Sequence, residues 1–499
     1  MPKQSIKTIL TCLAGVALLS GCADMTGLKP QGQLLSEQSV GATQSFTGVA
    51  PAPWPGDGWW RGLGGEPLDA LIGEAFKENP DLAAADARVR QATAQTGLAE
   101  ALLYPTLDAK ASIPDAPFPD NFPKPFAGYT TAKQANLTAS YVFDLWGGQR
   151  AAWEAALGQQ RAAEVDRAAA RLALSTRIAQ AYSDLEYAFS AHDVAIAEQE
   201  RAKQLLDLTR QRVQAGIDSL ALLHQAESTH ASAEQKTSMT AQRIESVRVQ
   251  LAVLLGQGPD RGLSIERPGQ LNAAELALPE NLPAELLGRR PDIVAARWRV
   301  EAARRNINAA KTQFYPNINL TAVFGVMAAN SSDLFKSSSR FGLVTPAISL
   351  PIFEGGRLRA NLAGRDADYD LAVAQYNKTL IGAFNEVAES LSQLRSLQAQ
   401  IEAQQRALAS AQQAWELSTQ RYRNGVGGYL EVLILQQALH LAEDRMAEIR
   451  NRRIDVSIDL VRALGGGYRT DAPVSLSGTS DTSPSSTALA SAPAATKEN

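Results

Sequence analysis

The sequence predicts a mainly α-helical chain that also contributes strands to a membrane β-barrel, with one structural unit present twice. Two proline-free runs, 141–258 and 352–467, indicate long helices, because a proline inside a helix costs about 3 kcal/mol. Each run has one glycine-bearing break, at Gly216 and at Gly425, and is therefore expected to fold back as a hairpin. A helix over 148–215 would be roughly 100 Å long at about 1.5 Å per residue. That length indicates a rod or tube.

The N-terminus has the features of a bacterial lipoprotein signal. Residues 1–21 combine two lysines with a short apolar stretch and end in Leu-Ser-Gly before Cys22. The box resembles the lipoprotein cleavage site, which implies removal of 1–21 and lipidation of Cys22 by an acyl (palmitate) anchor. Ala23 follows the cysteine, and in this resemblance a residue other than aspartate there implies the outer membrane. The alternative is an ordinary signal peptide with an incidental cysteine.

The ends of the mature chain are predicted to be extended. Residues 22–65 are rich in Gly, Pro, Ser and Gln and form a tether to the body, pinned by Trp54, Trp59 and Trp60. A short amphipathic helix is expected over Leu68 to Lys77. Residues 470–499 are low-complexity sequence, which predicts disorder.

The body is predicted to contain two repeats, over 66–270 and 271–469. A Pro-Asp pair opens and a Tyr-Pro pair closes both Asn79–Pro105 and Arg290–Pro316, at equal spacing. The glycine breaks and the final Leu-Gly pairs recur at the same offset of about 210 residues. Four landmarks in one order and spacing indicate a duplicated unit.

After each Tyr-Pro pair the hydrophobic period changes to two. Strands are expected at about 105–114, 134–143, 316–326 and 340–351, ahead of helical hairpins at about 147–256 and 355–465. Such segments are typical of a membrane barrel, apolar outside and polar inside. A soluble sandwich has the same alternation. The loops Pro114–Ala132 and Met327–Arg340 are long and polar, as external barrel loops should be. Because four strands cannot close, two copies would give eight strands and three would give twelve.

The long helices contain a hydrophobic repeat of 3.5 residues, which predicts coiled-coil packing. The first predicted seam comprises Ile178, Tyr182, Leu185, Phe189, His192 and Ile196. The second comprises Phe384, Val387, Leu391, Leu394, Gln398, Ile401 and Leu408. Glutamine, arginine and glutamate on the flanks suit a solvated face, as expected for the wall of a water-filled tube.

The sequence contains no recognisable catalytic motif, metal motif or phosphate-binding loop, and we expect no enzyme activity and no cofactor. His192, His224, His230 and His440 are scattered, and His192 is interpreted as a packed seam residue. Glu386 and Glu389 are interpreted as solvated helix-surface carboxylates. The net charge of −4 argues against nucleic acid as a partner.

Several stretches together carry a family resemblance. They are the lipoprotein box, the doubled Pro-Asp and Tyr-Pro landmarks, PIFEGGRLR at 351–359 and QRYRNGVGGYLEVL at 420–433. The chain resembles the TolC-like outer membrane efflux proteins, in particular the lipoprotein (NodT-type) factors of resistance-nodulation-division pumps. The resemblance implies a homotrimer with a twelve-stranded barrel and an α-helical periplasmic tunnel. It also implies a periplasmic adaptor (membrane fusion) protein and an inner membrane pump as partners.

The resemblance assigns functional roles to the hairpin ends. The residues implied to meet the adaptor are Arg212, Gly216, Arg421, Tyr422 and Gly425. The residues implied to line the closed aperture are Leu430, Glu431 and Ile434. Glu431 is the local carboxylate that could form a ring around a threefold axis and favour cations. Ile434 stands where some members have an acidic residue, which departs from the family pattern.

The leading hypothesis is a passive outer membrane exit duct of a tripartite efflux pump for drugs or other small molecules. A second hypothesis is the exit channel of a type I protein secretion system. A third is a periplasmic coiled-coil scaffold lipoprotein without a pore. The expected location is the cell outer membrane, with the chain lipid-anchored and extending into the periplasm.

Overall fold

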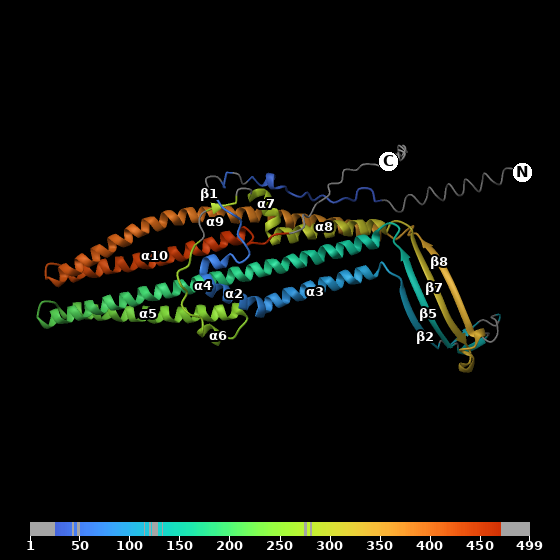
Figure 1. Cartoon of the computed structure of the whole chain (residues 1–499), viewed down its shortest axis with the longest axis horizontal. Helices are drawn as coiled ribbons and strands as arrows, with labels where there is room; N and C mark the ends of the chain where they lie inside the picture. The colour runs from blue at the N-terminus through green and yellow to red at the C-terminus, as the bar shows by residue number, and fades with distance from the viewer. Residues whose placement is uncertain are drawn as a thin grey trace, which may run out of the picture.

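The computed structural model describes residues 25–41, 44–46, 50–113, 115–118, 121, 128–131, 133–273, 277–279 and 282–470. The predicted signal peptide, Cys22 and nearly all of the predicted disordered tail lie outside these residues. The molecule is elongated, with a sheet at one end and the turns of two helical hairpins at the other (Figure 1). No helix among the described residues is both long and apolar enough to cross a membrane.

The duplicated unit predicted from the landmarks is present in the structure. In the first repeat the order is α3 (Pro80–Ala101), β2 (Thr106–Ser112), β5 (Lys133–Phe143), α4 (Gly148–Gln214) and α5 (Leu220–Leu255). In the second it is α8 (Pro291–Thr312), β7 (Asn317–Ala328), β8 (Arg340–Ser349), α9 (Arg357–Arg423) and α10 (Tyr429–Ala463). Both α4 and α9 contain 67 residues, which corresponds to about 100 Å.

The Pro-Asp landmarks work as helix starts. Pro80 and Pro291 each occupy the first turn of their helix, where a missing N–H removes no intrahelical hydrogen bond. The Asn79 side chain caps α3 by accepting from the backbone N–H groups of Asp81 and Leu82. At α8 the equivalent residue is Arg290, which caps nothing with its side chain.

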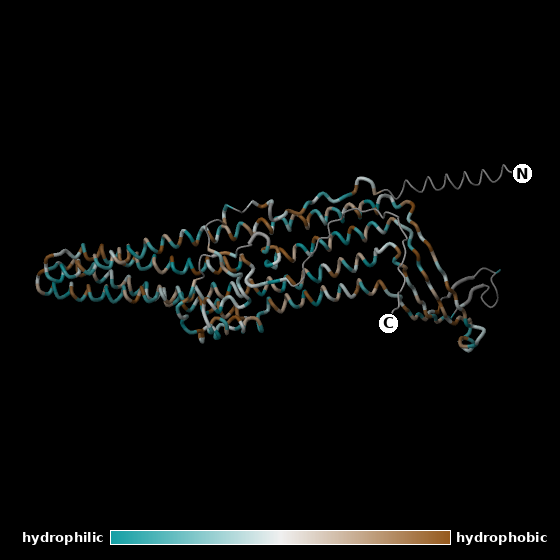
Figure 2. The backbone as a smooth tube through the Cα atoms, turned by 45° about the horizontal axis from the view of Figure 1, so that its top comes forward, coloured by the Kyte–Doolittle hydropathy of each residue, from teal (hydrophilic) through white to brown (hydrophobic). Residues whose placement is uncertain are grey.

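The four alternating segments form one antiparallel sheet in the order β2-β5-β7-β8. The central pair, β5 with β7, joins the two repeats, with Leu137 opposite Phe324 and Tyr141 opposite Leu320. In a single chain β2 and β8 are edge strands. Pro346 lies in β8, and an edge is where a sheet tolerates proline. Figure 2 shows mixed polar and apolar residues along the strands and the long helices.

The prediction of one long loop over Pro114–Ala132 was wrong in part. Asp115–Phe118 (β3) and Gly128–Thr131 (β4) pair as a separate antiparallel ladder. The second external loop contains two short 3-10 turns, η2 (Ser331–Asp333) and η3 (Ser337–Ser339).

The predicted seam of α4 was correct near its start and wrong further along. Ile178 and Leu185 are fully buried, whereas Ile196 is 47% exposed. The buried positions continue instead through alanines at every seventh residue: Ala181, Ala188, Ala195 and Ala202. These small residues let α5 approach closely, and Thr237 donates a hydrogen bond to the Ala195 carbonyl at 3.3 Å. In α9 the predicted seam residue Gln398 is likewise exposed, while Leu397 beside it is buried.

The N-terminal segment follows α9. The backbone N–H groups of Gln31 and Gly32 donate to Asp370 at 2.8 and 2.6 Å, and that of Leu35 donates to Asn377 at 2.9 Å. The chain then forms η1 (Glu37–Val40) and β1 (Ala50–Pro51), which pairs with β6 (Ala277–Leu278).

The helix expected over Leu68 to Lys77 is longer than predicted. It is α2 (Trp60–Glu78), which has a break at Gly65, where φ is 64°. It begins inside the stretch predicted as tether. Trp60 is buried, and Trp54 and Trp59 pack against core clusters. The short helices α6 (Pro259–Leu263) and α7 (Leu282–Arg289) were not predicted.

The interpretation of Glu386 as a solvated carboxylate was incomplete, because its side chain is 39% exposed but is also ion-paired. The guanidinium of Arg290, 6% exposed, donates to Glu386 at 2.8 Å and to Asp292 at 2.6 Å. Arg290 also donates to the Ala463 carbonyl at 3.1 Å. These bonds connect the start of α8 to α9 and to the end of α10. A buried cation needs such partners.

Candidate functional site at the helical tips

The two hairpin turns have the same backbone geometry. Gly216 and Gly425 adopt φ values of 72° and 76°, the left-handed region that glycine reaches without a Cβ clash. The N–H of the residue after each glycine returns to a carbonyl five residues earlier, Ile217 to Arg212 and Val426 to Arg421, at 2.9 and 3.0 Å. Both turns are thus helix C-caps of the Schellman type, which satisfy the last free carbonyls.

At the first tip an arginine and an aspartate form a close ion pair. Arg212 Nε lies 2.8 Å from Asp218 Oδ2, and Nη2 donates to Oδ1 at 3.3 Å. The two side chains are only 14% and 10% exposed. A two-point bond at such burial is worth more than an exposed surface pair, because both groups are held in place and partly shielded from water.

Tyr422 of the second hairpin binds to this pair. Its hydroxyl donates to Asp218 Oδ2 at 2.6 Å, and its backbone carbonyl accepts from Arg212 Nη1 at 3.2 Å. The Arg212 guanidinium lies over the Tyr422 ring, 4.5 Å from its centroid. Tyr422 is fully buried and packs edge-on against Tyr429. We call Arg212, Asp218 and Tyr422 the tip network, and it joins α4 to α9.

The tip network changes the acidity of its own members. The hydrogen bond from Arg212, followed by that from Tyr422, lowers the pKa of Asp218 below its ordinary value. Burial and the bond to Asp218 raise the pKa of Tyr422, and burial raises the pKa of Tyr429 to about 12. At neutral pH the network therefore holds an aspartate anion between an arginine and a neutral phenol.

The structure brings some of the predicted tip residues together and not others. Arg212 and Tyr422 are in contact, whereas the side chain of Arg421 is exposed and makes no hydrogen bond or ion pair among the described residues. Sequence reasoning missed Asp218. The signal was an acidic residue just after the turn glycine, with a basic residue just before that turn.

The residues predicted to line an aperture lie at the start of α10, beside the second tip. Leu430 and Ile434 are 65% and 58% exposed, and Glu431 is also exposed. Leu441 continues the same exposed face. Between them, Val432 and Leu439 are buried in the hairpin. In one chain, α10 therefore leaves an apolar face without a partner among the described residues.

A second polar connection lies about three helical turns before Arg212. Arg201 of α4 binds Glu443 of α10 at 2.6 Å and its neighbour Glu198 at 3.1 Å. Gln436 of α10 in turn donates to Glu198 at 2.7 Å. The two hairpins are thus joined by charged groups at two levels.

Comparisons with known proteins give a consistent assignment. The family model described as "Outer membrane efflux protein" matches residues 71–257 and 282–466, one match in each repeat. Among curated proteins, the chain is 37% identical over 365 residues to the fusaric acid resistance protein FusA of Burkholderia cepacia, covering 72% of this chain and 69% of FusA. It is 32% identical over 423 residues to the pyoverdine export outer membrane protein OpmQ of Pseudomonas aeruginosa, covering 83% and 88%.

The structure is similar to solved outer membrane proteins. The outer membrane protein VceC of Vibrio cholerae superposes with a TM-score of 0.78 at 35% identity, covering 83% of this chain and all of VceC. The outer membrane channel OprN gives a TM-score of 0.79 at 26% identity, covering 89% of this chain and 97% of OprN.

Proposed function

The chain belongs to the outer membrane efflux protein family, and from that premise we propose that it is the exit duct of a tripartite efflux pump. It is an outer membrane efflux channel. The observation that best supports the duct is one continuous chain path: strands at one end lead directly into helices about 100 Å long. Such a path joins a membrane pore to a periplasmic tube.

Three copies complete the channel in this proposal. The edge strands β2 and β8 leave backbone N–H and C=O groups unpaired in one chain, and lipid offers them no hydrogen-bond partner. Pairing β8 of one copy with β2 of the next closes the sheet, and three copies give twelve strands. The apolar face of α10 at Leu430, Ile434 and Leu441 then meets its counterparts in the other copies.

The tips dock a periplasmic adaptor protein, which is coupled to an inner membrane pump. The duct itself has no energy source and conducts passively. The tip network supports a closed resting state, because it fixes the second hairpin to the first at the end that meets the partner. Leu430, Glu431 and Ile434 of three copies form the narrow end. The acyl group on Cys22 is a second membrane anchor, in addition to the barrel.

The proposed cargo is small organic molecules. The relatives named above are described as acting in fusaric acid resistance and pyoverdine export. We propose cargo of this size class for the present chain. An enzymatic role forms no part of the proposal.

The direct test is the conductance of the purified, detergent-solubilised protein in planar bilayers. We expect a particle of three chains that conducts in low-conductance steps at rest and in larger steps when the tip network is broken by Asp218→Ala. A particle that stays monomeric once its acyl chain is removed would contradict the proposal, as would trimers that never conduct in either form.

A further inference from the structure

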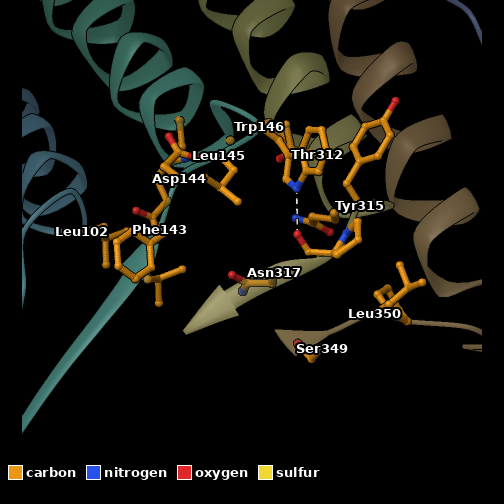
Figure 3. A pocket seen from close by; sticks show the side chains of 18 of the residues that line it. Leu102, Phe143, Asp144, Leu145, Trp146, Thr312, Tyr315, Asn317, Ser349 and Leu350 are labelled. Atoms are coloured by element: carbon orange, nitrogen blue, oxygen red, sulfur yellow. Dashed lines mark hydrogen bonds between the residues drawn. The ribbon is translucent and has the colours of Figure 1, made fainter. Parts of the chain in front are cut away.

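A cavity of about 650 Å³ lies where the sheet meets the helices, at the junction of barrel and tunnel. It is lined from both repeats by the ends of β5, β7 and β8 and the adjoining ends of α4, α8 and α9 (Figure 3). Its size falls in the range of pockets that hold drug-sized ligands, about 300–1,000 Å³.

The cavity and the N-terminal segment lie on opposite sides of the proposed channel wall. Arg359 of α9 donates to the Thr26 carbonyl at 3.2 Å, so that face of α9 carries the chain that leads to the lipid anchor. Arg357, which lines the cavity, is two residues earlier and therefore about 200° around the helix. The N-terminal segment must run outside the channel to reach lipid, which places the cavity on the lumen side.

The strands lead to the same assignment. Asn317 and Ser349 line the cavity and are directly opposite each other in the β7–β8 register. With Val142 they lie on the polar side of the sheet, since Ile318 and Leu320 point to the other side; of the four strand residues that line the cavity, only Phe143, which is opposite Ile318, belongs to that other side. In a barrel with an apolar exterior, the polar side faces the water-filled lumen.

One wall of the cavity is a fixed aromatic stack. Trp146 and Tyr315 lie with ring centroids 4.9 Å apart and an interplanar angle of 27°. The indole N–H donates to the Pro316 carbonyl at 2.7 Å, which holds the ring in place. Trp146 remains 50% exposed, so a substantial part of this large ring is open to a ligand. Figure 3 shows this stack on one side of the cavity, with Asn317 and Ser349 on the other.

The charged groups of the cavity are already engaged. Asp144 caps α4 by accepting from the backbone N–H groups of Gln149 and Arg150 at 3.1 and 2.8 Å. Glu354 is paired with Arg357.

We propose that this cavity is a transient binding site for efflux cargo at the tunnel–barrel junction, selective for uncharged aromatic molecules. The ring of the cargo stacks on Trp146. Because the charged groups of the cavity are already paired, they attract simple ions only weakly. Three copies would place three such sites around the lumen. The inference rests on the proposed channel, because it needs a lumen that cargo passes through.

The test uses the full-length trimer and chloramphenicol, a neutral nitroarene with hydroxyl and amide donors. Binding is measured by titration calorimetry on the solubilised trimer, and interruption of single-channel current is recorded in parallel. We expect saturable binding and matching current interruptions. Trp146→Ala should weaken binding roughly tenfold, since an aromatic stack is worth up to about one factor of ten.

The matched control is Phe353→Ala, which removes an 81% exposed aromatic ring at the same junction that does not line the cavity. It should leave binding unchanged. If Trp146→Ala does not assemble, Trp146→Leu replaces it, which keeps an apolar side chain beside Tyr315 but removes the aromatic ring on which cargo stacks. Equal binding by wild type and the Trp146 variant would overturn the inference, as would no binding by wild type. Trimers that bind chloramphenicol but never conduct would contradict the channel and leave the cavity supported.

Discussion

The two hairpin tips share a backbone and differ in side chains. Both end in a glycine with positive φ and the same returning hydrogen bond. The first tip carries Asp218 two residues after its glycine, whereas the second carries Gly427 at the equivalent place. A Cβ at Gly427 would lie 3.1 Å from the Tyr422 nitrogen, so the second tip has little room for a side chain there. Of the two equivalent turns, only the first therefore supplies the carboxylate, and only the second supplies the tyrosine that binds it.

This asymmetry joins the two hairpins to each other. If both tips carried the same charges, each hairpin could satisfy its own ion pair. Here the pair of the first tip is completed by Tyr422 from the second, so the hairpins hold each other. Breaking the network frees both.

The largest expected effect comes from replacing the glycines on which both turns depend. Replacing either Gly216 or Gly425 with valine places a β-branched residue in the left-handed region, at a cost of at least about 1–2 kcal/mol and with a displaced turn. We expect trimers that migrate normally on gels but no longer export, for both variants. Full export of every tested compound by Gly425→Val would show that the tip does not meet the adaptor. Export lost in one variant and kept in the other would show that the two turns are not equivalent in function.

The second largest effect should differ between the two tips. Arg212→Ala leaves Asp218 buried beside a tyrosine without its cation and should destabilise the closed tip by about 2–3 kcal/mol. Arg421→Ala is the matched control at the equivalent position, and because Arg421 is exposed the change should stay within about 0.5 kcal/mol. Resting conductance in planar bilayers is the measurement. Equal conductance of both variants would remove the distinction.

The smallest effect is a response to acid. Because Arg212 lowers the pKa of Asp218 in the folded protein, this group stabilises the closed tip fully above the ordinary aspartate pKa. That contribution is lost as the pH falls through the lowered value. Resting conductance of wild type should therefore be flat near neutrality and rise only below about pH 4. The Asp218→Asn variant should lack this rise, and an identical acid response in both proteins would assign it to other groups.

Local patterns were sufficient to predict the four main strands and the long helices of both repeats, in their order. Proline-free runs, period-two segments and Pro-Asp starts act through the backbone itself, so they need no partner to be recognised. The predictions failed for residues whose surroundings depend on a contact with a distant part of the chain. The ion pair of Glu386 was missed because nothing near Glu386 along the chain indicates Arg290, which lies 96 residues away. Ile196 was predicted to be buried because an apolar residue at the right spacing is normally core, yet the close approach of α5 selected Ala195 instead.

The sequence by itself determined the two repeats, the turn glycines and the unfinished sheet, because each follows from the conformational limits of proline and glycine and from side-chain period. Tertiary structure alone decided that Asp218 and Tyr422, 204 residues apart, share a hydrogen bond, and that Trp146 faces a cavity built from both repeats. Such contacts depend on how two long hairpins and one sheet pack together, and the pattern of residues along a helix or strand does not specify that packing.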